Sequence, residues 1–88
     1  MKSMLISYDL RSPGRNYDDL YDVIKSFPDW AHITESTWCV KTHLDCVELR
    51  DKLCSVLDRN DRMFVAELTG VAAWRNVLCG SDKLQEIL

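Results

Sequence analysis

The stretch MLISYDLRSPGRNY, residues 4–17, decides the fold of this 88-residue chain. Its first half, residues 4–10, is mostly apolar or β-favouring, and a Pro-Gly turn follows it. We therefore predict a central strand over residues 4–10 with one carboxylate, Asp9, close to its carboxyl end. Sheets present binding and catalytic side chains at such strand ends, so Asp9 is the first candidate site residue. The alternative is that Asp9 only begins the turn, where it accepts hydrogen bonds from the following amides.

Length and composition indicate one small domain spanning residues 1–88. A chain of this size buries only about 60% of its unfolded surface, which leaves little margin for independent stability. Yet 47% of the residues are apolar, more than one small core easily hides, and this favours a homodimer. The net charge of −3 argues against a protein that binds nucleic acid non-specifically along a broad surface, because such a surface needs an excess of basic residues.

The residues also predict the compartment. No signal peptide and no apolar run long enough to span a bilayer are visible, so we expect a cytoplasmic protein that does not bind membranes. The four cysteines lack a Cys-x-x-Cys spacing and are interpreted as reduced thiols. Neither histidine lies at ligand spacing from a cysteine, which argues against zinc.

After the first turn, the hydrophobic pattern changes from a helical to a strand period. Apolar residues recur at helical spacing over residues 17–27, with Asn16 as the expected N-cap and Pro28 as the terminator. Residues 30–35 and 37–42 are rich in aromatic and β-branched side chains. We predict that they form a β-hairpin.

In the second half of the chain, a helical pattern is again followed by a strand pattern. A helix is expected over residues 44–57 and a fourth strand over 63–68. The order strand, helix, strand, strand, helix, strand is typical of the ferredoxin-like βαββαβ fold, an α+β fold whose two helices cover one face of a four-stranded antiparallel sheet. Residues 70–88 form a C-terminal extension with a short helix over 82–88, which either folds back or reaches a partner. We expect the other face of the sheet to be open, to carry Trp, Ile, Val or Met side chains, and to form the dimer interface.

Three segments of the chain resemble a known family. Residues 8–17 read Tyr-Asp-Leu-x-x-Pro-Gly-x-x-Tyr, Trp30-Ala31-His32 precedes Ser36-Thr37-Trp38, and the Glu-Leu-Thr-Gly of residues 67–70 is followed by Trp74. These segments resemble the SinR-like branch of the superfamily that contains the Cas-two proteins of CRISPR adaptation and the virulence-associated D ribonucleases. The similarity spans roughly residues 4 to 75.

The resemblance implies a site. In Cas-two proteins an Asp at the position of Asp9, one from each subunit, lies at the dimer centre and is proposed to hold a divalent cation for phosphodiester cleavage. Asp9 is therefore expected to be catalytic and to bind Mg²⁺ or Mn²⁺, and His32 is a candidate general acid or base. The residues expected to bind nucleic acid or a nucleotide are Tyr8, Arg11, Arg15, Asn16, Tyr17, Ser36, Thr37 and Trp38. Where Cas-two proteins follow their Asp with a basic run, this chain has Pro13-Gly14 and the acidic Asp18-Asp19.

Two function classes follow from these residues. The first is a metal-dependent phosphodiesterase, an endonuclease or endoribonuclease, with Asp9 from both subunits at the metal and Arg11 or Arg15 on the phosphate of RNA, DNA or a small nucleotide. The second is a non-catalytic dimeric module that binds a partner or sequesters a nucleotide in the dimer groove. The acidic balance and the lone carboxylate favour the module. A second acidic or histidine ligand close to Asp9 would favour the enzyme.

Overall fold

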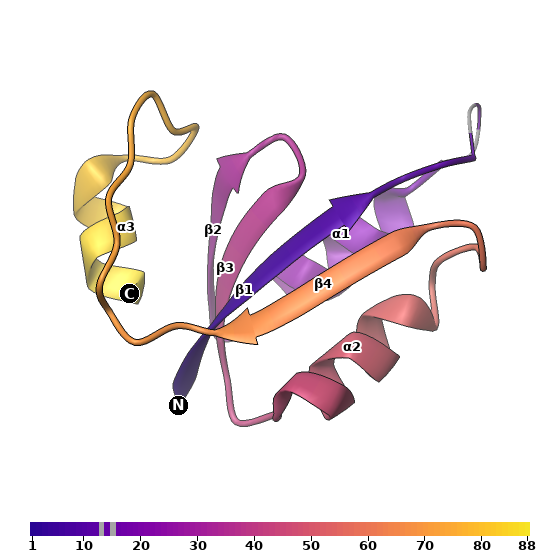
Figure 1. Cartoon of the computed structure of the whole chain (residues 1–88), viewed down its shortest axis with the longest axis horizontal. Coiled ribbons are helices and arrows are strands. Elements are labelled where there is room, and N and C mark those ends of the chain that lie inside the picture. The colour runs from indigo at the N-terminus through magenta and orange to yellow at the C-terminus, as the bar shows by residue number, and fades with distance from the viewer. Residues whose placement is uncertain (13, 15) are drawn as a thin grey trace.

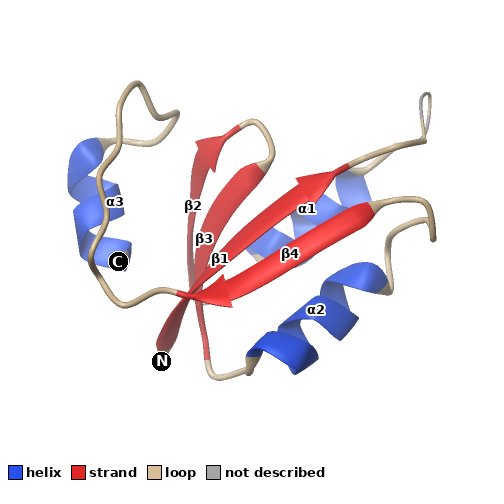
Figure 2. Ribbon diagram, in the orientation of Figure 1, coloured by secondary structure: helices blue, strands red, loops and turns tan. Residues whose placement is uncertain are grey.

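The computed structural model describes residues 1–12, 14 and 16–88, and these contain four strands and three helices. The elements are β1 (Lys2–Asp9), α1 (Asp18–Lys25), β2 (Asp29–Thr34), β3 (Thr37–Thr42), α2 (Cys46–Cys54), β4 (Arg62–Glu67) and α3 (Ser81–Ile87). The strands form one antiparallel sheet in the order β2-β3-β1-β4 (Figure 2). The predicted α+β class, the βαββαβ order and the C-terminal helix are confirmed.

Strand β1 is central because it pairs with β3 on one side and β4 on the other. Its alternate side chains Met4, Ile6 and Tyr8 are buried against the two helices that follow β1 and β3. Trp38 and Val40 of β3 point to the same side and complete the centre of this core. Period-two alternation thus puts the largest apolar side chains on the helix-covered face.

The two covering helices begin one or two residues later than expected. Tyr17, and not Asn16, is the N-cap of α1, while the Asn16 Oδ1 accepts a hydrogen bond from the Asp18 amide at 2.8 Å. Helix α2 begins after Asp45, whose side chain caps the Glu48 amide while the Glu48 carboxylate accepts from the Asp45 amide. This reciprocal capping box sets the start of α2 and shortens the helix predicted over residues 44–57. No helix among the described residues is long and apolar enough to cross a membrane.

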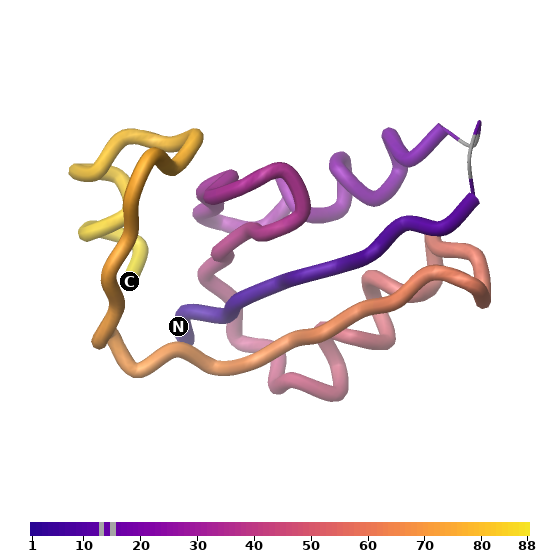
Figure 3. Tube along the Cα trace, turned by 45° about the horizontal axis from the view of Figure 1, so that its top comes forward, coloured from indigo at the N-terminus to yellow at the C-terminus, as the bar shows by residue number. Residues whose placement is uncertain are grey.

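The second face of the sheet is partly covered by the C-terminal extension. Gly70, at a φ of 89°, follows β4, and the chain then crosses to place α3 beside β2 (Figures 1 and 3). Leu84 and Ile87 of α3 are buried against Ala31 and Cys39, and they form a second, smaller core. This covering corrects the expectation of a fully open face.

The side chains on that second face also differ from the expectation. Trp30 and Trp38 contribute to the helix-covered core instead. The part of the second face beyond α3 carries Phe64, which is 63% exposed. Among the described residues of this face, the large apolar side chain that remains exposed is therefore Phe64, on β4.

A hydrogen bond fixes the end of α3 to the start of β1. The buried Ser3 hydroxyl donates to the Ile87 carbonyl at 2.6 Å, which brings the two ends of the chain together. Figure 3 shows the chain termini close to each other at this end of the molecule. The extension is therefore part of the domain and folds back on its own sheet.

We predict that Ile87→Ala lowers the free energy of unfolding by about 2–5 kcal/mol, because a fully buried side chain is removed from the second core. Val71→Ala, at a side chain that is 91% exposed, is the control and should change it by less than about 0.5 kcal/mol. Urea unfolding followed by tryptophan fluorescence measures both. Equal stability of Ile87→Ala and wild type would show that α3 does not pack on the sheet.

Candidate functional site

Asp9 lies at the carboxyl end of β1, directly opposite Arg62 on β4. Its Oδ2 is 3.1 Å from the Arg62 Nη1 and 3.7 Å from the Arg11 Nη1. The three side chains are each about half exposed or more, so water reaches all of them. One carboxylate therefore holds two solvent-accessible guanidinium groups at the rim of the sheet.

The loop after β1 is tied to the loop before β4 through Asp61. The Asp61 Oδ1 accepts hydrogen bonds from the Arg11 amide at 2.7 Å and from the Tyr17 hydroxyl at 2.8 Å. The Tyr17 hydroxyl in turn accepts from the Ser12 amide. Tyr17, expected as a ligand contact, therefore positions the Arg11 backbone.

Tyr8 connects the core to the turn between β2 and β3. Its buried hydroxyl accepts a hydrogen bond from the Trp38 Nε1 at 2.9 Å and donates to the Glu35 carbonyl at 3.2 Å. The Tyr8 amide also donates to the Ser36 carbonyl. Burial raises the pKa of Tyr8, while the hydrogen bond from Trp38 acts in the opposite direction, so the hydroxyl remains a neutral donor and acceptor at neutral pH.

His32 stacks on Trp38, with ring centroids 3.8 Å apart and an interplanar angle of 7°. Its Nε2 lies 3.2 Å from the Glu35 carbonyl, within hydrogen-bond distance. Trp38 itself is only 2% exposed and also packs on Trp30 and Tyr21. Trp38 was expected to contact nucleic acid or a nucleotide, and in the structure its ring is enclosed by these protein side chains.

A cavity of about 490 Å³ opens where these elements meet. We name it the rim cavity, and its lining residues come from β1, α1, β2 and the turn that follows β2. They are Tyr8, Asp9, Leu10, Tyr21, His32, Glu35 and Ser36. Volumes of about 300–1,000 Å³ are typical of small-molecule sites. Three of these residues have an aromatic side chain, two have a carboxylate, and Ser36 has a hydroxyl group.

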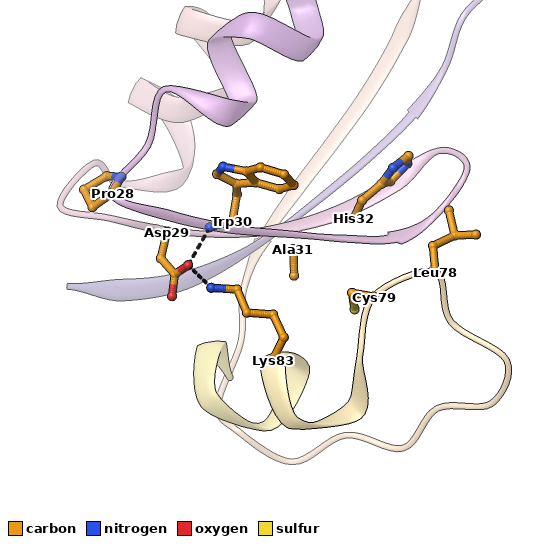
Figure 4. Close-up of a pocket in the computed structure, with 8 residues that line it drawn as sticks. All are labelled: Pro28, Asp29, Trp30, Ala31, His32, Leu78, Cys79 and Lys83. Atoms are coloured by element: carbon orange, nitrogen blue, oxygen red, sulfur yellow. Dashed lines mark hydrogen bonds and ion pairs between the residues drawn. The ribbon is translucent and has the colours of Figure 1, made fainter.

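Two further cavities adjoin this region. One, of about 210 Å³, lies between β1 and β4 and shares Tyr8 and Asp9 with the rim cavity. The other, of about 520 Å³, follows the edge of β2 beside Cys79 and Lys83 (Figure 4). Lys83 there donates a hydrogen bond to Asp29, which raises the pKa of the lysine. His32 lines both the rim cavity and this edge cavity.

The surroundings of Asp9 do not fit a divalent-cation site formed by one chain. A Mg²⁺ or Mn²⁺ site needs several oxygen ligands, whereas Asp9 faces two cationic side chains. Among the described residues, no group of three or more His, Cys, Asp or Glu side chains is placed to hold a metal ion. A site of this kind would need ligands from a second subunit.

The structure brings together only some of the residues expected from the sequence. Tyr8, Asp9, His32 and Ser36 line the rim cavity, and Arg11 reaches Asp9 at its edge. Thr37 lies opposite Ser7 on the other face of the sheet, and Asn16 acts locally at the start of α1. The expectation for Arg15 concerns a position outside the described residues.

Sequence reasoning missed Tyr21, Glu35 and Arg62. Arg62 becomes a neighbour of Asp9 only through the register of β1 and β4, which no local pattern reveals. Tyr21 belongs to the apolar stripe of α1, and this position predicts packing against the core. It does not predict that Tyr21 also lines a cavity. Glu35 is the last residue of the predicted strand over residues 30–35, and the local pattern does not mark it as a site residue.

Comparison of the chain with protein-family models, with curated proteins and with solved structures finds no match. The geometry of the rim is therefore the main support for a functional conclusion.

We predict that Tyr8→Phe lowers the free energy of unfolding by about 1–3 kcal/mol, because it leaves the buried Trp38 N–H without its acceptor. Urea unfolding measures the change, and the tryptophan emission spectrum reports the altered surroundings of the indole. A variant as stable as wild type would show that the hydroxyl does not bind Trp38.

Proposed function

We propose that this protein is a cytosolic, homodimeric module that binds single-stranded nucleic acid or a nucleotide at the carboxyl end of β1. The observation that supports the proposal most strongly is the pairing of two exposed guanidinium groups with an adjacent aromatic cavity. The resemblance to the SinR-like and Cas-two proteins points to the same class of ligand. Binding without catalysis is the function that this geometry supports best.

The guanidinium groups of Arg11 and Arg62 provide the phosphate contacts. Arginine binds phosphate oxygens through a planar fork of N–H donors, often with two hydrogen bonds at once. Both groups are at the surface, and their ion pairs with Asp9 are of the exposed kind, which contribute little net free energy. A phosphate can therefore displace Asp9 from either arginine at small cost.

The rim cavity provides the base contacts. Tyr8, Tyr21 and His32 are among its lining residues, and aromatic side chains bind bases of single strands by stacking. Paired bases in a duplex are not available to such a cavity. The overall negative charge is consistent with a local site for a short segment of a strand.

Dimer formation would use the part of the second face that α3 leaves uncovered. Phe64 of β4 is exposed on this face. On the same face of the neighbouring strand β1 lie the half-buried Leu5 and the exposed Asp9. A symmetric contact through this patch would bring the two Asp9 side chains closer together. A metal-dependent phosphodiesterase, with Asp9 from both subunits on Mg²⁺ or Mn²⁺, is the competing function that the experiment below also tests.

We predict that Arg62→Gln weakens the binding of labelled single-stranded RNA or DNA several-fold. The change should also reduce the slope of log affinity against log salt by about one, as expected for the loss of one phosphate contact. Fluorescence anisotropy at several salt concentrations measures both quantities. Arg50→Gln is the matched control, because Arg50 is likewise exposed and paired with a carboxylate, but lies on α2. Equal losses in both variants would contradict a specific site.

Asp9→Asn separates binding from catalysis in the same assay. In a binding module the substitution frees Arg11 and Arg62, so affinity for the strand should rise. In a metal-dependent phosphodiesterase it should abolish cleavage that wild type performs with Mg²⁺ or Mn²⁺. Metal-dependent cleavage by wild type that is lost in Asp9→Asn would replace the module with the enzyme.

For the assembly, we predict a dimer at low micromolar concentration, with twice the chain mass of 10.2 kDa by light scattering. Phe64→Ser should shift the mass towards the monomer, because it removes the large exposed side chain from the open patch. Val71→Ser changes an exposed apolar side chain of the C-terminal extension and should leave the dimer intact. A wild-type mass of one chain throughout this range would rule out the dimer.

A further inference from the structure

We infer that the rim cavity selects guanine over the other bases, through the carboxylate of Glu35. This inference rests on the proposed function and specifies the ligand of the same site. It depends on three features of the cavity. One carboxylate is available to a ligand, the backbone that carries this carboxylate is held by hydrogen bonds, and arginine side chains lie just outside the cavity.

Glu35 is the carboxylate of the rim cavity that is available to a ligand. Its side chain is exposed, and among the described residues it makes no hydrogen bond or ion pair. The other carboxylate of the cavity, Asp9, faces Arg11 and Arg62. A base that enters the cavity therefore meets one acceptor group whose two oxygens are both free.

The backbone of Glu35 is held in place from two sides. Its carbonyl accepts a hydrogen bond from the Tyr8 hydroxyl and lies within hydrogen-bond distance of the His32 Nε2. The neighbouring Ser36 carbonyl accepts from the Tyr8 amide. The turn is thus fixed to β1 and β2 before a ligand arrives, which lowers the entropy lost on binding.

A free carboxylate distinguishes the bases by their donors. Guanine presents two adjacent donors, N1–H and the 2-amino group, which match the two oxygens of a carboxylate. Adenine and cytosine each present one amino donor next to a ring-nitrogen acceptor, and this acceptor would face a negative oxygen. Uracil presents one N–H between two carbonyl oxygens. Charge-assisted pairs of parallel hydrogen bonds give both strength and geometric specificity.

The surroundings of Glu35 suit the rest of a nucleotide. The cavity volume of about 490 Å³ is sufficient for a base with its sugar. Tyr8, Tyr21 and His32 line the same cavity. Arg11 lies beside Asp9 at the edge of the cavity, where the phosphate of a bound nucleotide would lie.

The test compares single-stranded RNA heptamers that differ in one base. Each is a fluorescein-labelled oligouridylate with guanine, hypoxanthine, adenine or cytosine at its centre, and binding is followed by anisotropy in EDTA. Wild type should bind the guanine heptamer at least about tenfold more tightly than the adenine heptamer. Hypoxanthine, which lacks the 2-amino group, should be intermediate.

Glu35→Gln keeps the shape of the side chain but replaces one acceptor with a donor. It should remove the preference for guanine, while the backbone bonds of Glu35 remain. Glu86→Gln, at an exposed carboxylate on α3, is the matched control and should retain the preference.

Two results would overturn the inference, and they differ in whether the proposed function is also contradicted. If wild type binds all heptamers equally, or if Glu35→Gln keeps the preference, guanine selection is wrong while the proposed function stands. If wild type binds none of the heptamers, the proposed function is wrong as well.

Discussion

The buried Trp38, on an inner strand of the sheet, connects the core to the candidate site through its hydrogen bond to Tyr8. Its ring is 2% exposed and lies among Tyr21, Trp30 and His32. An indole buried in this way needs an acceptor for its N–H, since an unpaired buried donor costs about 1–3 kcal/mol. Tyr8 supplies the acceptor, and its own hydroxyl hydrogen then needs an acceptor in turn. The Glu35 carbonyl completes this chain of hydrogen bonds, so the core determines where the turn lies.

The candidate site is a consequence of that arrangement. Tyr8 and His32 are held by core contacts, yet both reach the surface of the rim cavity next to the end of β1. Arg62 and Arg11 meet there because Asp9 attracts both from neighbouring positions. Exposed ion pairs are weak, so they can orient the guanidinium groups without blocking them. Two exposed guanidinium groups thus lie close to a cavity that Tyr8, Tyr21 and His32 help to line.

The C-terminal extension changes which surfaces of the domain are open. A four-stranded sheet with two helices leaves one face uncovered, and in so small a domain that face is a natural interface. Here α3 covers the side nearest β2 and β3, where Cys39 is fully buried. Burial raises the pKa of the Cys39 thiol to about 11, so it stays protonated and unreactive at neutral pH. The face near β4 remains open, with Phe64 at the surface.

The class of fold and the order of its elements follow from the residue pattern along the chain. The β-favouring runs over residues 4–10 and 37–42 and the helical spacing over residues 17–27 are local signals. Such signals depend on neighbours within a few residues of the chain. Both helices lie where the pattern predicts them, whereas the limits of α2 and the N-cap of α1 differ from the prediction by a few residues.

The composition of the site, by contrast, depends on contacts between elements that are far apart in the chain. Arg62 faces Asp9 because of the register between strands that are separated by most of the chain. Glu35, Tyr21 and His32 come together around Tyr8 because packing on Trp38 joins three elements. Likewise, the choice between a folded-back and an extended C-terminal segment depended on a complementary surface from Ala31 and Cys39. Contacts of this kind arise from three-dimensional packing, and no short stretch of sequence contains them.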